Sequence, residues 1–274
     1  MNKGALYFLG PKGTYSETGA KKALDFLKKD IDLVPVSTIS KVVEIVDSDI
    51  EAIGVLPYEN SIEGIVRQTI DSIYLSEVKI QAEIDVKIEH CFISRSDNKS
   101  KIKNIISHPQ ALAQCQQYIL ANFDENINLI QSASTAQGAN MLFERDESYA
   151  AIASELVAND LKLNILDKNI GDIKENKSRF VLISKKPMDL GKKIATSIAF
   201  NTKNKPGALL AVLEILKKHN INLIYLESRP SKKVFGEYNF FADIDKGIDE
   251  IKPVLDEIER ECNYYKFLGS YPVI

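Results

Sequence analysis

The chain has 274 residues, of which 45% are hydrophobic and 27% are charged, with a formal net charge of −3. This composition is typical of a folded protein of two or three compact units. The charge balance excludes the basic surface needed to coat nucleic acid. No apolar run approaches the roughly 20 residues that span a bilayer. Three widely spaced cysteines, Cys91, Cys115 and Cys262, favour free thiols in a reducing cytoplasm.

The first 60 residues alternate between strand and helix patterns. Three short apolar strands are expected, at Ala5–Leu9, Leu33–Val36 and Ile53–Leu56. Apolar residues at helical spacing predict a helix over Tyr15–Lys29 and a second helix from about Ser37, whose hydroxyl can cap it. This alternation predicts a parallel sheet with covering helices.

The pattern changes near residue 78. Lys79–Ile93 alternates strictly, and its length allows one long strand or two strands with a crossover between lobes. A second unit of alternating strands and helices follows, at Ile102–Ile106, Pro109–Asn122, Ile127–Ile130, Ser134–Phe143, Ala150–Ala153 and Glu155–Asp160. Strands near Leu163–Ile165 and Phe180–Ile183 complete it. We expect two α/β lobes, one formed by about 1–77 and 155–186 and the other by about 78–154.

Lys185–Lys193 carries charge, proline and glycine without apolar periodicity, which predicts a linker. The remaining segment, 194–274, alternates as strand, helix, strand, strand, helix and strand. Their expected ranges are Ile194–Asn201, Pro206–His219, Ile221–Ser228, Tyr238–Asp243, Ile248–Cys262 and Tyr264–Tyr271. This βαββαβ order is the ferredoxin-like motif, so we expect a separate C-terminal domain.

Several kinds of site are disfavoured. His90 and Cys91 are adjacent on a predicted strand and point to opposite faces, and His108 and His219 have no partner at ligand spacing. The sequence lacks the nucleophile motif of serine hydrolases and the glycine fingerprints of nucleotide-binding loops. We therefore expect neither a metal nor a cofactor.

Neutral hydrogen-bonding residues gather instead where predicted elements meet. Thr14, Ser134 and Thr135 stand at helix starts, where they are either simple N-caps or part of a cradle for a carboxylate or phosphate. Asn60 follows a strand, as either an ordinary Asx turn or a cleft residue. Arg179 in the 176–180 stretch supplies a cation suited to an anionic substrate.

Taken in order, these motifs resemble those of prephenate dehydratases with a C-terminal regulatory ACT domain. The motifs are Gly10-Pro-Lys-Gly-Thr-Tyr-Ser-Glu17, Leu56-Pro-Tyr-Glu-Asn-Ser61, Ser107-His-Pro-Gln-Ala-Leu-Ala-Gln114, Ser134-Thr-Ala136, Asn176-Lys-Ser-Arg-Phe180, Gly207-Ala-Leu-Leu210 and Glu227-Ser-Arg-Pro230. The resemblance covers essentially the whole chain, and the joint order is specific although no single motif is.

The resemblance implies a catalytic domain over 1–186, with two α/β lobes similar to those of periplasmic binding proteins, and an ACT domain over 194–274. It implies a site between the lobes that converts prephenate to phenylpyruvate, water and carbon dioxide in phenylalanine biosynthesis. It also implies feedback inhibition by L-phenylalanine. ACT domains commonly pair, so a homodimer or homotetramer is expected, without a nucleic-acid or membrane partner.

By this resemblance, the residues that match active-site positions are Asn60, Ser107, Gln114 and Ser178. Those that match substrate-binding motif positions are Thr14, Ser61, Ser134, Thr135 and Arg179. Those that match phenylalanine-binding positions are Gly207, Ala208, Leu209, Leu210, Glu227, Ser228, Arg229 and Pro230. Three residues depart from the family pattern: Ser178 replaces a threonine, Tyr58 an aliphatic residue and Leu210 a valine. None of these changes removes a reacting group.

Two alternatives remain open. Arogenate dehydratase performs the same reaction on the aminated substrate. A non-catalytic amino-acid sensor with a solute-binding fold would also have two lobes and an ACT-like tail. The 176–180 stretch argues against the sensor, because a sensor has no need of a hydroxyl and an arginine at that point.

Overall fold

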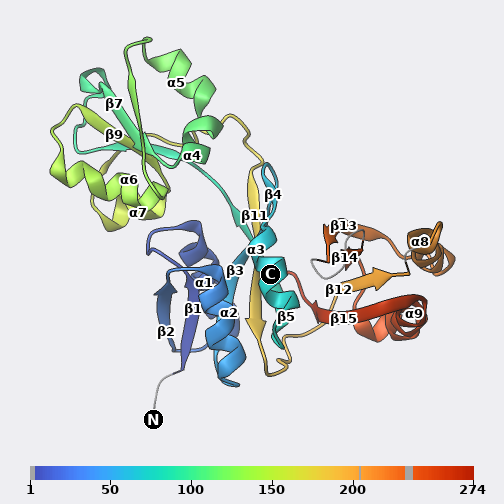
Figure 1. Cartoon of the computed structure of the whole chain (residues 1–274). Helices are drawn as coiled ribbons and strands as arrows, with labels where there is room; N and C mark the ends of the chain where they lie inside the picture. The colour runs from blue at the N-terminus through green and yellow to red at the C-terminus, as the bar shows by residue number, and fades with distance from the viewer. Residues whose placement is uncertain (1–3, 204, 232–236) are drawn as a thin grey trace.

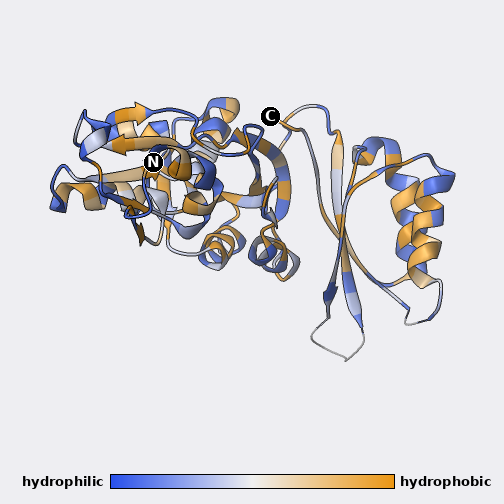
Figure 2. Cartoon of the chain, turned by 90° about the horizontal axis from the view of Figure 1, so that it is seen from above, coloured by the Kyte–Doolittle hydropathy of each residue, from blue (hydrophilic) through white to orange (hydrophobic). Residues whose placement is uncertain are grey.

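The computed structural model describes residues 4–203, 205–231 and 237–274. They form two α/β lobes and a C-terminal domain (Figure 1). Seen from above, the C-terminal domain stands beside the lobes, with its helices on the side turned away from them (Figure 2). The described residues contain no helix that is long and apolar enough to cross a bilayer.

Lobe one comprises β1 (Ala5–Leu9), α1 (Tyr15–Leu27), β2 (Asp32–Val36), α2 (Ile39–Ser48), β3 (Ile53–Asn60), β4 (Gly64–Ile65), α3 (Arg67–Tyr74), β5 (Lys79–Lys87) and β11 (Lys177–Ser184). β1 pairs in parallel with β2 and β3, as predicted. Because strand side chains alternate between faces, Leu6 and Phe8 pack with Ala20 of α1, whereas Tyr7 packs with Val42 of α2 on the other face. Helices therefore cover both faces of this sheet.

Lobe two is a five-stranded sheet in the order β10-β6-β9-β7-β8. Its elements are β6 (Cys91–Ser94), η1 (Lys99–Lys101), β7 (Asn104–Ser107), α4 (Pro109–Gln114), α5 (Gln116–Asn122), β8 (Asn128–Gln131), α6 (Thr135–Met141), η2 (Leu142–Glu144), β9 (Tyr149–Ala153), α7 (Glu155–Asp160) and β10 (Asn164–Asp167). The helix predicted over 109–122 is broken at Cys115. There the carbonyl of Gln114 accepts from Asp172 N at 2.7 Å, while the Asp172 carboxylate accepts from the Gln117 N–H at 3.2 Å.

The strand pairing corrects the expected lobe boundaries. β5 lies in the large sheet beside β11, and β10 lies in the lobe-two sheet beside β6. The chain therefore crosses between lobes at 88–90 and at 168–176, rather than near 78 and 155. The segment 79–93 is two strands with a crossover, which was one of the two predicted possibilities. The observed boundaries differ from the predicted ones because β5 is buried between two neighbouring strands of the large sheet. The local sequence pattern does not reveal this long-range pairing.

The C-terminal domain comprises β12 (Ala195–Thr202), α8 (Ala208–Lys218), β13 (Leu223–Pro230), β14 (Tyr238–Ile244), α9 (Ile248–Glu261) and β15 (Cys262–Tyr271). Its strand order, β13-β14-β12-β15, and its βαββαβ connectivity confirm the predicted ferredoxin-like motif. Residues of α8 and α9 share one core with this sheet.

The C-terminal sheet continues into lobe one. β15 pairs in parallel with β5, with Gly269 opposite Ile80. A Cβ at Gly269, whose φ is +153°, would lie 2.3 Å from the carbonyl oxygen of Ile80, so only glycine permits this approach. The final residue extends the pairing, since Ile274 N donates to Glu83 O at 2.8 Å. The two domains thus share one ten-stranded sheet.

Candidate functional site

A cavity of about 400 Å³ lies between the lobes, within the size range of small-molecule sites. Residues from both lobes and from the crossings line it. The lining includes six of the residues predicted as catalytic or substrate-binding: Thr14, Asn60, Gln114, Ser134, Thr135 and Ser178. Three others predicted for the site, Ser61, Ser107 and Arg179, are not in this lining.

Asn60 is the anchor of the site. It ends β3, where its Oδ1 accepts from the backbone N–H groups of Ile62 at 3.0 Å and Glu63 at 3.1 Å. These two bonds fix the orientation of the carboxamide, because only the oxygen can accept them. Its Nδ2 therefore faces β11, where it lies 3.1 Å from Lys177 O and 3.0 Å from Ser178 Oγ. The antiparallel register, which sets Ser178 opposite Asn60, brings the pair together.

Ser178 presents a hydroxyl donor to the cavity. Asn60 Nδ2 can only donate, so Ser178 Oγ accepts in that contact and keeps its own proton for another acceptor. Within the described parts of the chain, this side chain has no second hydrogen-bond partner. The residue is half-buried at the cavity wall. A ligand oxygen in the cavity can therefore accept from it.

A chain of hydrogen bonds links the Asn60 corner to lobe two. Asn60 Nδ2 donates to Asn176 Oδ1 at 2.8 Å, and Asn176 Nδ2 donates to Gln114 Oε1 at 3.2 Å. Gln114 Oε1 also lies 3.0 Å from His90 Nε2. Two residues of this hydrogen-bonded network, Asn176 and His90, are not among the predicted site residues. Asn176 begins the polar motif over 176–180, which is a local signal for it, whereas the sequence offers His90 only as a candidate metal ligand.

Two helix N-termini line the same cavity, at Thr14 on α1 and at Ser134 on α6. The Thr14 hydroxyl donates to Pro11 O at 2.9 Å and so does not cap α1. The Ser134 hydroxyl does cap α6, accepting from Gln137 N at 3.0 Å. Free N–H groups and the positive end of the helix dipole favour an anionic ligand at these positions.

Ser107 and Ser61 each form a hydrogen bond that joins two backbone segments near the site. Ser107 is fully buried and donates to Ile152 O at 2.6 Å, which ties β7 to β9 beneath α4. Ser61 Oγ accepts from Lys177 N at 3.0 Å and lies 3.4 Å from Asn176 Oδ1. Neither residue is in the described lining of the cavity, and each hydroxyl already bonds a backbone group of a neighbouring segment.

Arg179, predicted to supply a cation to the substrate site, is not in the described lining of the cavity. It follows Ser178 on β11 and therefore points to the opposite face of the sheet. Its guanidinium pairs with three carboxylates, which are Glu59 at 2.8 Å, Glu83 at 3.2 Å and Asp243 at 2.9 Å. Asp243 belongs to β14 of the C-terminal domain. The described lining of the cavity contains no lysine or arginine, and includes Glu59 and Glu63.

Asp243 lies at the centre of this interdomain cluster. Besides the Arg179 pair, its Oδ1 accepts from Tyr58 OH at 3.1 Å and from Ser197 Oγ at 2.6 Å. Tyr58, which departs from the family pattern, thus uses its hydroxyl to bind the C-terminal domain. The Arg179 guanidinium also lies over the Tyr58 ring, 5.3 Å from its centroid. The residue next to Ser178 is therefore held by the C-terminal sheet.

The cluster predicts a pH dependence of stability. Burial raises the pKa of Glu83 from its ordinary 4.5 to about 7, although Arg179 opposes the shift. The Glu83 carboxyl therefore binds a proton more tightly in the folded state than in the unfolded state. Its contribution lowers the free energy of unfolding as the pH rises from about 4.5 to about 7. Urea unfolding of Glu83→Gln should show a smaller loss of stability across this window than the parent. Parallel pH profiles for the two proteins would contradict this expectation.

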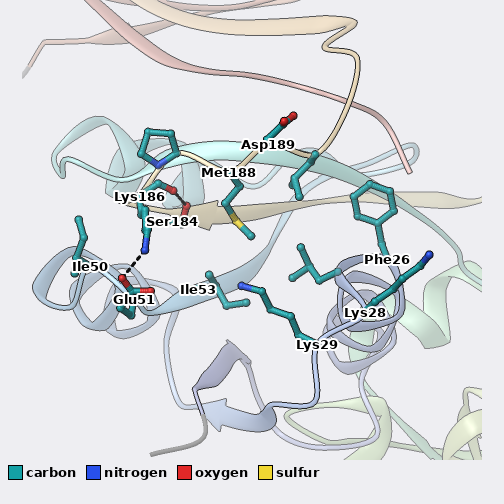
Figure 3. Close-up of a pocket in the computed structure, with 13 residues that line it drawn as sticks. Phe26, Lys28, Lys29, Ile50, Glu51, Ile53, Ser184, Lys186, Met188 and Asp189 are labelled. Carbon is teal, nitrogen blue, oxygen red and sulfur yellow. Dashed lines mark hydrogen bonds and ion pairs between the residues drawn. The ribbon is translucent and has the colours of Figure 1, made fainter.

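Another hollow, of about 550 Å³, lies at the opposite end of lobe one, near the start of β3 and the end of β11 (Figure 3). Lys186 pairs there with Glu51 at 2.6 Å, and both side chains are exposed. The buried Ser184 hydroxyl is already bonded to Lys186 O. A ligand site needs polar groups that converge, so the interlobe cavity is the better candidate. In the described residues no cluster of histidine, cysteine and acidic side chains is placed to hold a metal.

The segments predicted to bind phenylalanine lie apart within one chain. Gly207–Leu210 opens α8 and lines a hollow of about 380 Å³, to which the 227–230 segment does not contribute. Glu227 and Arg229 on β13 instead face α3 of lobe one. There Glu227 pairs with Arg67 at 3.3 Å and Arg229 with Asp71 at 3.0 Å.

These features define a two-lobed α/β protein with a polar small-molecule cleft and an attached ferredoxin-like domain. A family model described as prephenate dehydratase matches residues 6–188, and a model of the ACT domain matches residues 196–263. The chain therefore belongs to the prephenate dehydratase family and carries an ACT domain, which confirms the predicted resemblance.

Three similar proteins illustrate this membership. The prephenate dehydratase of Methanocaldococcus jannaschii is 42% identical over 278 residues, covering 100% of this chain and 99% of the relative. The structure of a prephenate dehydratase from Arthrobacter aurescens in complex with L-Phe has a TM-score of 0.86 at 31% identity, covering 98% of this chain and 90% of that one. A protein described as a novel type of quorum quenching acylase has a TM-score of 0.86 at 26% identity, covering 98% of each chain.

Proposed function

We propose that this chain catalyses the conversion of prephenate to phenylpyruvate, water and carbon dioxide in phenylalanine biosynthesis. The observation that carries the proposal is the hydroxyl of Ser178, which is oriented by Asn60 and free to donate into the interlobe cavity. Membership of the prephenate dehydratase family supports the same reaction. The three free cysteines favour a reducing cytoplasm as its location.

The chemistry suits the residues that line the cavity. The ring of prephenate becomes aromatic in one fragmentation. The bond between ring and carboxylate breaks, carbon dioxide leaves, and the electron pair enters the ring as the carbon–oxygen bond breaks and hydroxide departs. The hydroxide takes a proton from solvent and becomes water. Ser178 donates a hydrogen bond to the departing oxygen and so stabilises charge that develops in the transition state. The Asn60 amide, which donates to Ser178 Oγ, polarises that hydroxyl and strengthens the bond.

The absence of lysine and arginine from the described lining has a role in this scheme. The ring carboxylate loses its charge as carbon dioxide forms. A cation beside it would stabilise the charged ground state more than the transition state and so raise the barrier. Without a neighbouring cation, the carboxylate is lost more easily as carbon dioxide. The other carboxylate of the substrate keeps its charge, and the helix starts at Thr14 and Ser134 offer it N–H donors.

Arogenate is the second candidate substrate. It carries an ammonium group where prephenate carries a keto group, and the carboxylate of Glu63 at the cavity wall suits a cation. Acyl transfer is less well supported. A serine nucleophile needs an adjacent base, whereas the described hydrogen-bond partner of Ser178 is the Asn60 amide donor.

Purified protein incubated separately with prephenate and with arogenate tests the proposal. Phenylpyruvate from prephenate, or phenylalanine from arogenate, is detected by mass spectrometry, and the two values of kcat/KM decide the substrate. We expect the larger value for prephenate. Failure to turn over either compound would overturn the proposed activity.

The proposal extends to inhibition by L-phenylalanine through the ACT domain. The Gly207–Leu210 hollow lies at the start of α8, where backbone N–H groups suit an amino-acid carboxylate. Because the 227–230 segment of the same chain is elsewhere, a second copy would supply the remaining contacts. β13 is the edge strand of its sheet, and its Ile224 and Leu226 are 51% and 38% exposed, which favours pairing into a homodimer or homotetramer.

Gly207→Val tests the regulatory site. Gly207 has a φ of +81°, and a Cβ there would meet no atom of the described residues within 4 Å, so the substitution acts through backbone strain at the hollow. The phenylalanine concentration for half-inhibition should rise at least about fivefold, the lower end of typical allosteric couplings, with little change in kcat without effector. Gly191→Val is the matched control, since Gly191 has a φ of +95° and equally open surroundings but lies in the interdomain connection. Equal inhibition of both variants would place the regulatory site elsewhere.

A further inference from the structure

His90 and Gln114 form a buried pair at the cavity wall. His90 is only 5% exposed and lies in the first crossing between the lobes, where its carbonyl accepts from Ile170 N of the second crossing at 2.9 Å. Gln114 ends α4 of lobe two. Both residues line the interlobe cavity and also an adjoining hollow of about 320 Å³.

The backbone sets the direction of every hydrogen bond in this pair. Asn60 Oδ1 accepts two backbone N–H groups, so Asn60 Nδ2 must donate to Asn176 Oδ1. Asn176 Nδ2 then faces Gln114 and donates to its Oε1 at 3.2 Å. Reversing either carboxamide would bring two donors together. The atom of Gln114 that faces His90 is therefore the oxygen.

This orientation of Gln114 determines which ring nitrogen of His90 carries a proton. Gln114 Oε1 only accepts, so His90 Nε2, at 3.0 Å, must carry the proton. In the neutral ring, Nδ1 then keeps a lone pair, and among the described residues this buried atom has no hydrogen-bond partner. Burial lowers the pKa of His90, which favours the neutral ring. The neutral His90 ring therefore donates from Nε2 to the carboxamide oxygen of Gln114.

Gln114 is left with one unused group. Its Oε1 accepts from both Asn176 and His90, which fills both lone pairs. Its Nε2 is buried and has no partner in the described part of the chain. An amide N–H₂ without a partner is costly in a folded protein, so its persistence in a side chain that lines the cavity indicates a donor kept for a ligand.

We propose that His90 is a positioning residue for the reaction proposed above. By donating from Nε2 to Gln114 Oε1, it holds the carboxamide so that the Gln114 N–H₂ group binds an oxygen of the anionic substrate. His90 acts through Gln114 and does not itself contact the reacting atoms. The inference rests on the proposed function for its kinetic consequence, but the state of the pair can be measured in the protein alone.

The kinetic test uses His90→Leu, which removes the donor, and His90→Gln, whose amide can still donate to Gln114. His90→Leu should lower kcat/KM by roughly 10- to 100-fold, the range expected when a binding group is misplaced by about 1 Å. His90→Gln should recover most of that loss. His90→Leu/Gln114→Ala should be no slower than Gln114→Ala alone, because both changes remove one function. His219→Leu, at a surface histidine in the ACT domain, is the control and should match the parent.

Additive losses in the double variant, or full activity of His90→Leu, would overturn the proposal. A long-range proton–nitrogen NMR spectrum of the unsubstituted protein gives a readout that does not depend on activity. It should show a neutral His90 ring protonated at Nε2, and a ring protonated at Nδ1 would refute the arrangement. If the protein turns over neither prephenate nor arogenate, the proposed function fails, whereas the spectrum still decides the His90–Gln114 pair.

Discussion

Ser178→Ala is expected to fold normally and to lose roughly 10²–10⁴ in kcat, the range for removal of an acid or of a transition-state hydrogen-bond donor. The fold should tolerate the change because Ser178 is half-buried and Asn60 Nδ2 keeps its bonds to Asn176 and Lys177. KM should change little, since the hydroxyl acts on an oxygen that departs. Steady-state kinetics together with a thermal melt measure both parts of this expectation.

Ser178→Thr is the matched variant for this experiment. It keeps the hydroxyl and adds the methyl group that the family usually has, which restricts the side-chain rotamer. Most of the activity should remain. An alanine variant with a kcat near that of the parent would remove Ser178 from the mechanism, and loss of activity in both variants would point to packing at β11 rather than to the hydroxyl.

Asp243→Ala is expected to cost about 3–5 kcal/mol of unfolding free energy, the usual effect of removing one partner of a buried ion pair. Asp243 is 1% exposed and accepts from Arg179, Tyr58 and Ser197. Its removal leaves the largely buried Arg179 guanidinium with fewer acceptors and cuts the polar link between the ACT sheet and β11. The effect should appear in urea unfolding and as a lower Tm.

Asp256→Ala is the control for Asp243→Ala. Asp256 lies exposed on α9, so its replacement should change stability by no more than about 0.5 kcal/mol. If the two variants lose equal stability, the interdomain cluster does not contribute as its geometry indicates. Because Arg179 is adjacent to Ser178, the same measurement shows how firmly the ACT domain holds the segment that carries the proposed catalytic hydroxyl.

Local pattern was sufficient for most of the elements and for part of the site. The strand at Ala5–Leu9 and the six elements of the C-terminal domain follow from apolar periodicity, which depends on residues close in sequence. Asn60 and Ser134 were recognised because strand ends and helix starts need side chains that satisfy backbone groups. The ordered motifs then indicated the family, which the family model confirms.

The tertiary structure decided what local pattern leaves open, above all which face of a strand meets the cavity. Ser178 and Arg179 are neighbours, yet β11 pairing turns one toward the cavity and the other toward Asp243 of the ACT domain. The lobe boundaries depended on β5, whose partners come from segments about 100 to 190 residues later in the chain. Likewise, no local signal joins His90 to Gln114, because their contact is made only when the crossing packs against lobe two. Periodicity therefore determined the elements, whereas long-range pairing determined which side chains share the site.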